Sequence, residues 1–179
     1  MLGQSCTENH QLSEFMKTGV ITDGISRDFE HALNVMDEFG LQFAELQFVW
    51  DKEVGFLEDA EVQKVNELLH LHQMKVSSIC HHIFAGMPMT TKPGEPLHIQ
   101  HLDRLKRCME IAHGVGSPNV RILSPKKEQI LFGAHCAEKW NVAKGAWDAL
   151  LPIIAPALEI AKDAGKQLVV ETGNGTMVN

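Results

Sequence analysis

The sequence predicts an α/β protein in which parallel strands alternate with helices. Short apolar runs rich in β-branched residues alternate with segments of helical periodicity along the chain. Strands in such an alternation pair in parallel through right-handed crossovers. The segments that follow strands are long (50–59, 85–96 and 125–145), whereas those that follow helices are short and contain glycine. Because ligands bind at the carboxyl ends of parallel strands, the long loops mark the expected functional face.

The folded domain is expected to span residues 18–179. Residues 1–17 show no sustained period and are predicted to form a poorly structured leader. Beyond them, runs of Val, Ile and Phe bounded by turn residues predict strands, because such side chains fit a pleated and half-buried surface. The five predicted strands begin near residues 19, 41, 75, 119 and 167.

Four segments carry apolar residues at the spacing of one helical face. Phe39 in the first segment and Leu97 in the third are expected on the buried faces of their helices. Pro152 and Pro156 predict a kink or a late start in the fourth, because proline interrupts helical hydrogen bonding. The predicted helices span residues 26–40, 59–73, 96–116 and 146–165.

Composition excludes several classes of protein. A net charge of −7 argues against a nucleic-acid partner, because phosphate binding needs a basic face. No run approaches the ~18 apolar residues of a membrane span. The four cysteines lie far apart without a C-x-x-C pair, which favours reduced thiols and a cytoplasmic location over disulfides or a zinc site.

Two architectures fit five alternating strands. An open, doubly wound sheet would close within 179 residues, whereas a (β/α)8 barrel needs about 250. Length alone therefore favours the open sheet. The first turn, "TDGISRD", however lacks the glycine-rich signature by which a doubly wound sheet usually binds a nucleotide.

The residues at the strand ends reverse that preference. They are Glu45 in "FAELQF", His81 and His82 in "ICHHIF", Ser124 in "RILSP" and Glu171 in "VVETGNG". With "HLDRLKRCMEIAHGVGSPNVRIL" and "WDALLPIIAPALEIAKDAGKQLVVETGNG", this pattern resembles the xylose isomerase-like barrel superfamily over residues 19–179. That superfamily comprises sugar isomerases and epimerases and includes the apurinic endonucleases. The resemblance implies a partial (β/α)8 TIM barrel of about five parallel strands.

The resemblance also implies a metal site at the barrel mouth. Family members hold Mn²⁺, Mg²⁺, Co²⁺ or Zn²⁺ with a glutamate, an aspartate, a histidine and a second glutamate from the later strands. The metal bridges two oxygens of an open-chain sugar, and a carboxylate moves the proton next to the carbonyl through an enediolate. Glu171 matches the first ligand and a catalytic position. The other three ligands belong to strands that this sequence does not contain, so metal binding by the chain alone is doubtful.

Three further side chains are candidates for substrate binding. One of His81 and His82 is expected to face the barrel mouth and the other the helices, because successive strand residues alternate. A hydrogen bond at the strand end is an equal alternative for both. Glu45 is expected either to orient substrate or to form a structural hydrogen bond. The pairs His98 with His101 and His70 with His72 are predicted to lie on the surface.

The predicted function is therefore a sugar or sugar-phosphate isomerase or epimerase, with activity that requires strands absent from this sequence. The alternatives are a non-catalytic α/β fragment or small-ligand binding domain, and a metal hydrolase like the apurinic endonucleases. Ser124, where those endonucleases carry histidine, weakens the last. Five strands would leave exposed sheet edges and interior side chains such as Val169. We expect the missing strands on a longer parent chain, with a homodimer through the edges or a marginally stable chain as the other outcomes.

Overall fold

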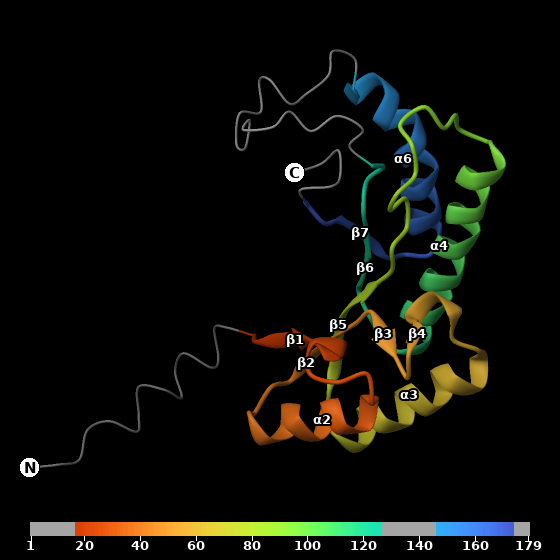
Figure 1. Ribbon diagram of the computed structural model, residues 1–179. Coiled ribbons are helices and arrows are strands. Elements are labelled where there is room, and N and C mark those ends of the chain that lie inside the picture. The colour runs from red at the N-terminus through yellow and green to blue at the C-terminus, as the bar shows by residue number, and fades with distance from the viewer. Residues whose placement is uncertain (1–16, 127–145, 174–179) are drawn as a thin grey trace, which may run out of the picture.

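The computed structural model describes residues 17–126 and 146–173 and contains one sheet of five parallel strands (Figure 1). These strands are the five that the sequence predicts, although most of them are shorter than the apolar runs. Their bounds are β1 Gly19–Ile21, β2 Phe43–Leu46, β5 Lys75–Cys80, β6 Asn119–Ile122 and β7 Gln167–Val170. The predicted leader lies outside the described residues, apart from Lys17.

The order of the strands decides between the two architectures. Each strand is parallel to the one before it, and the order β1-β2-β5-β6-β7 never reverses. A doubly wound sheet reverses at a switch point, whereas a barrel wall advances steadily. Because every crossover runs the same way, the helices follow one another around the outside of the sheet (Figure 1). The predicted partial barrel is confirmed.

Four helices cover this outer face. They are α2 Phe29–Glu38, α3 Asp59–Leu71, α4 Pro96–Gly114 and α6 Ala146–Asp163. α6 runs through Pro152 and Pro156, so the predicted late start is wrong. Phe39 and Leu97 are exposed rather than buried, because Phe39 lies past the end of α2 and His98 turns inward in place of Leu97. None of the described helices is long and apolar enough to cross a bilayer.

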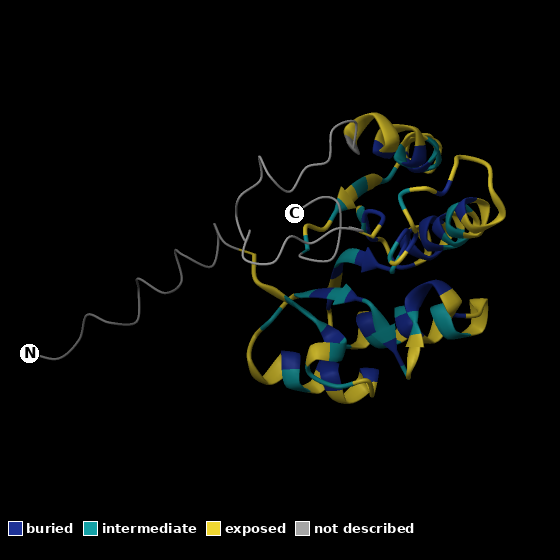
Figure 2. Cartoon of the chain, turned by 45° about the horizontal axis from the view of Figure 1, so that its top comes forward, coloured by how far each residue is buried: buried dark blue, intermediate teal, exposed yellow. Residues whose placement is uncertain are grey.

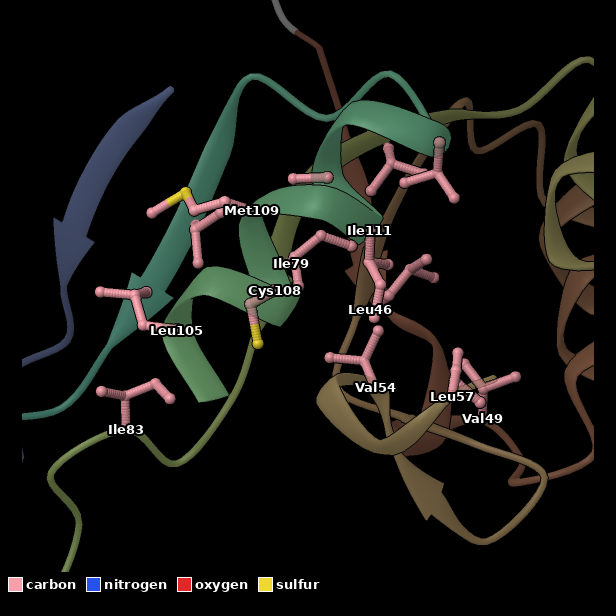
Figure 3. Close-up of a cluster of buried hydrophobic side chains, with 14 of the residues drawn as sticks. Leu46, Val49, Val54, Leu57, Ile79, Ile83, Leu105, Cys108, Met109 and Ile111 are labelled. Carbon is pink, nitrogen blue, oxygen red and sulfur yellow. The ribbon is translucent and has the colours of Figure 1, made fainter. Parts of the chain in front are cut away.

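The hydrophobic core lies between these helices and the outward-facing strand residues. Leu46, Ile79 and Ile122 of three neighbouring strands belong to one buried cluster, which Leu105 and Ile111 of α4 join. Figure 3 shows Leu46 and Ile79 beside these α4 side chains. All five side chains are almost fully buried. Truncating such a leucine or isoleucine to alanine costs about 2–5 kcal/mol of stability. This cluster therefore fixes the sheet on which the functional side chains are mounted.

The predicted strand 41–49 is interrupted after Leu46. A small antiparallel hairpin follows, made of β3 Phe48–Val49 and β4 Lys52–Glu53, and then the 3-10 helix η2 Val54–Phe56. The backbone N–H of Val54 donates to the carbonyl of Gln47 at 2.8 Å, which returns the chain to the end of β2. The run 19–25 is divided in the same way, into β1 and the 3-10 helix η1 Thr22–Gly24.

The two outer strands of the sheet leave an edge open. Within residues 17–126 and 146–173, β1 and β7 each pair with a single neighbour. Beside β7, one face of α6 is exposed along its length (Figure 2). Val169 of β7 is exposed as its interior position predicts. The exposed apolar side chains of the α6 face are Trp147, Leu151 and Leu158, spaced as one helical stripe.

Candidate functional site

The inner face of the sheet lines an open cavity of about 1140 Å³. Strand residues alternate between the two faces of a sheet, so residues not directed into the helix-covered core are directed here. Polar side chains line this cavity at the carboxyl ends of the strands, and Lys17, Asn66, His70, Lys75, Ser77 and Asn119 line it elsewhere. Those at the carboxyl ends are Glu45 in the second strand and Gln47 just after it, His82 after the third, Arg121 in the fourth and Glu171 after the fifth.

Glu45 and Cys80 are joined on this face. The Cys80 thiol donates to Oε1 of Glu45 at 2.8 Å. A register shift between Ala44 and Glu45 sets Glu45 opposite Ser78, two residues before Cys80. Burial, together with the hydrogen bond to Glu45, raises the pKa of Cys80 to about 12. The thiol therefore stays protonated at neutral pH and acts as a hydrogen-bond donor to the carboxylate.

Glu171 lies against Arg121. Nε of Arg121 is 3.0 Å from Oε2 of Glu171, with the arginine side chain 8% exposed and the glutamate 53% exposed. The contact is an ion pair rather than an aligned hydrogen bond, because Nε of Arg121 has no hydrogen-bond partner of good geometry among the described residues. The pair forms because β6 and β7 are in register, with Arg121 opposite Val169. Arg121 thus neutralises the carboxylate that the sequence singles out.

The two adjacent histidines point to different surroundings, although Nδ1 of both rings lies near Oε1 of Glu53, at 3.3 Å for His81 and 2.6 Å for His82. His82 lines the cavity, as the alternation predicts for one of the pair. His81 is buried on the helix side, where its ring meets Phe56 edge-on at 5.4 Å. Burial lowers the pKa of His81 to about 4, although Glu53 opposes that shift. A contact between His81 and a substrate in the cavity does not fit this placement, because His81 is buried and does not line the cavity.

Glu53 and Gln47 hold the two ring nitrogens of His82. Oε1 of Glu53 is 2.6 Å from Nδ1 of His82 and accepts the His82 backbone N–H at 2.7 Å. Nε2 of Gln47 is 3.2 Å from Nε2 of His82. Both partners come from the segment after β2, where the sequence predicts the end of a strand and a loop. Gln47 and Glu53 stand on either side of the Trp50–Asp51 turn but not next to it, and no local motif marks them as partners of His82.

His98 and His101 on α4 have structural roles. His98 is buried, so its predicted surface position is wrong; its Nε2 lies 2.9 Å from the carbonyl oxygen of Ile153, and its ring stacks on Phe84. Nδ1 of His101 accepts the backbone N–H of Phe84 at 3.1 Å. These contacts join α4 to α6 and to the loop after β5. His98 and His101 therefore stabilise the scaffold and do not form a metal site.

Comparisons with known proteins identify the family to which this architecture belongs. The sequence matches the xylose isomerase-like TIM barrel over residues 25–179. The chain belongs to the xylose isomerase-like TIM barrel family. No curated protein matches the sequence.

Solved structures of this family resemble the chain in fold. The IOLI protein with a binding zinc atom is 18% identical at a TM-score of 0.61, with 85% of this chain and 50% of that chain covered. A Mycobacterium smegmatis family member in complex with magnesium is 16% identical at 0.58, with 84% and 48% covered. A Methylomonas sp. D-allulose 3-epimerase in complex with D-allulose is 12% identical at 0.58, with 83% and 47% covered. The chain therefore spans about half the length of these relatives.

The family resemblance implies that Glu171 belongs to a metal site at the barrel mouth. Within the described ranges, no cluster of three or more His, Cys, Asp or Glu side chains is arranged to hold an ion. Glu171 lies at the strand end where the resemblance expects the first ligand, but its charge is paired with Arg121. Glu45 is engaged by Cys80 and His82 by Glu53. The described part of the chain does not form a metal site by itself.

Proposed function

We propose that this chain supplies the amino-terminal part of the active site of a sugar or sugar-phosphate isomerase or epimerase. The observation that carries the proposal is the cavity on the inner face of a family barrel wall, with Glu45, His82, Arg121 and Glu171 at the carboxyl ends of successive strands. Such a face is where barrel enzymes bind substrate and react. The D-allulose complex of a family member supports a sugar as the ligand class.

In this proposal the described residues bind and orient a polyhydroxylated ligand. Oε1 of Glu45 accepts the hydrogen bond from Cys80. The other carboxylate oxygen of Glu45 is the proposed acceptor for a sugar hydroxyl. The ring of His82, 42% exposed, meets the ligand from the third strand. Arg121 holds the carboxylate of Glu171 toward the cavity. Proton transfer next to a carbonyl needs an acid or base in hydrogen-bond reach of the carbon, and Glu171 is the proposed group.

In this proposal the metal ion is bound by Glu171 together with ligands that this sequence does not contain. The chain spans about half the length of its solved relatives, some of which carry magnesium or zinc. Titration of Mn²⁺ into the chain, followed by calorimetry, tests this assignment. We expect no micromolar binding by the chain alone. Micromolar binding that Glu171→Gln abolishes would instead mean that the chain holds the ion without further strands.

Activity is tested in a chimera that joins this chain to the later strands of the Methylomonas D-allulose 3-epimerase. With Mn²⁺ in D₂O, the chimera should replace a sugar proton next to the carbonyl by deuterium, which NMR detects. Glu171→Gln should slow the exchange by at least about 100-fold, the usual contribution of a positioned acid or base. Glu159→Gln, at an exposed position on α6, is the matched control. A folded chimera that exchanges no proton in any ketose or ketose phosphate would refute the proposal.

A small-ligand binding domain is the second candidate. It is favoured by the absence, among the described residues, of a cluster able to hold a metal, beside a cavity large enough for a sugar. Saturation-transfer NMR of the chain with sugars and no metal distinguishes it. Binding that depends on Glu45 and His82 but not on Glu171, without exchange activity in the chimera, would favour this candidate over the enzyme.

A further inference from the structure

One short segment of the chain makes three contacts with the ring of His82. Gln47 and Glu53 lie at the two ends of the β3–β4 hairpin, and each meets a different nitrogen of the His82 ring. The ring of Phe48, within the same hairpin, lies 6.2 Å from the imidazole. Three contacts from one hairpin on one cavity-lining side chain leave the imidazole little freedom to rotate.

The hairpin adopts an unfavourable backbone to make these contacts. Its two-residue turn consists of Trp50 and Asp51, with φ of 49° and 65°. Such turns are normally built from asparagine and glycine, because a side chain is disfavoured at positive φ. Outliers of this kind concentrate at sites where geometry serves function. The turn is held by the Trp50 N–H, which donates to the Arg27 carbonyl at 2.9 Å, and by the edge-on contact of Trp50 with Phe29.

The contacts define the protonation pattern of the imidazole ring. A carboxylate only accepts hydrogen bonds, so the 2.6 Å contact with Glu53 requires a proton on Nδ1. Glu53 is 14% exposed, which shields this contact from water. Nε2 is then the acceptor nitrogen of the neutral ring, and the amide N–H of Gln47 donates to it at 3.2 Å. A ligand hydroxyl that replaces Gln47 would meet the same lone pair.

We propose that Glu53 is a positioning residue that fixes His82 as the Nδ1–H tautomer, with Nε2 presented to the cavity as a proton acceptor for a substrate hydroxyl. This inference rests on the proposed function for its biological meaning. It adds a group that hydrogen-bonds the histidine and not the substrate, as carboxylates orient histidines in many enzyme sites. Glu53 lies 29 residues before His82 in the sequence and reaches it only through the hairpin.

The tautomer can be measured in this chain without substrate or metal. Long-range ¹H–¹⁵N correlation on ¹⁵N-histidine protein separates protonated from unprotonated ring nitrogens, at a pH about two units above the ordinary histidine pKa of ~6.5. The His82→Gln variant assigns the signals by their loss. We expect Nδ1 of His82 to be protonated and Nε2 unprotonated, with a preference of at least about tenfold, as a hydrogen bond to a charged group supplies.

Glu53→Gln should remove this preference and move both ¹⁵N shifts toward averaged values. Asp51→Asn is the matched control, since it removes another acid of the same hairpin, 81% exposed, while asparagine tolerates the turn. The control should leave the His82 signals unchanged. A wild-type ring that is protonated at Nε2 or already averaged would overturn the inference, even if Glu53→Gln did not fold. So would a preference that persists in folded Glu53→Gln.

This experiment separates the inference from the proposed function. A fixed Nδ1–H tautomer in a protein whose chimera exchanges no sugar proton would leave the positioning role of Glu53 intact and the isomerase proposal refuted. An active chimera in which His82 shows no preferred tautomer would do the reverse.

Discussion

Lowering the pH should destabilise the folded chain through His81. Its side chain is 6% exposed, and its Nδ1 has no hydrogen-bond partner among the described residues. Burial lowers its pKa to about 4. Of the groups around it, Glu53 raises the pKa, whereas Arg104, His82 and His101 lower it further. A proton on His81 is therefore unfavourable in the folded state.

The size and sign of the effect follow from proton linkage. In the unfolded chain the pKa returns to about 6.5. Above that value His81 is neutral in both states, so it makes stability independent of pH there. Between about 6.5 and 4 the unfolded chain binds a proton that the folded chain does not, so the free energy of unfolding falls by about 1.4 kcal/mol per pH unit. From pH 7 to pH 5 the loss is about 2 kcal/mol.

Urea unfolding of wild type and His81→Asn at pH 7 and pH 5 measures this contribution. The substitution has its own cost, but that cost cancels when the pH dependences of the two proteins are compared. The His81→Asn chain should lose about 2 kcal/mol less than wild type between the two pH values. His31→Gln, at an exposed position on α2, should lose as much as wild type. Equal losses in wild type and His81→Asn would refute the reasoning.

Three further changes test the packing. Gly55→Ala should cost about 1–3 kcal/mol in urea unfolding, because its Cβ would lie 2.9 Å from both Cys108 Sγ and His81 Nδ1; a loss under ~0.5 kcal/mol would show that this contact yields easily. With Cys80 as the one remaining cysteine, the folded chain should resist a thiol reagent at neutral pH, because the pKa of the buried thiol is raised to about 12. Rapid labelling without unfolding would contradict its burial. Lys166→Met should cost about 1–2 kcal/mol in the same unfolding assay, since Nζ donates to the Ser117 carbonyl at 2.8 Å. Exposed Lys162→Met should stay within about 0.5 kcal/mol, and equal costs for the two would show that the Ser117 contact contributes nothing.

The positions of the elements follow from local pattern. Each of the five strands begins within two residues of its predicted start, and all four helices lie inside their predicted segments. Where the local pattern predicted the wrong buried residue, tertiary packing determined which side chain is buried. Leu97 and His98 are neighbours on α4, and hydropathy favours burying Leu97, but a carbonyl of α6 and the ring of Phe84 receive His98 instead. Propensity cannot anticipate a partner that another helix supplies.

The residues of the candidate site also divide into those that the sequence could identify and those that only the structure shows. Glu45, His82 and Glu171 could be named from the sequence, because each stands where an apolar strand ends and strand ends share one edge. Arg121 was missed although it interrupts an apolar strand, and only the register of β6 with β7 shows that it faces Glu171. Glu53 was missed because a hairpin within a predicted loop carries it to His82.

The sequence by itself determined where the chain extends and coils, and which family of barrels it joins, because periodicity and family phrases are local properties of the chain. The tertiary structure alone decided which polar side chains meet. The pairs Arg121 with Glu171 and Glu53 with His82 join residues 50 and 29 positions apart. The first pair depends on strand register, because a shift of a single residue would send each strand side chain to the other face of the sheet. The second pair depends on one strained turn.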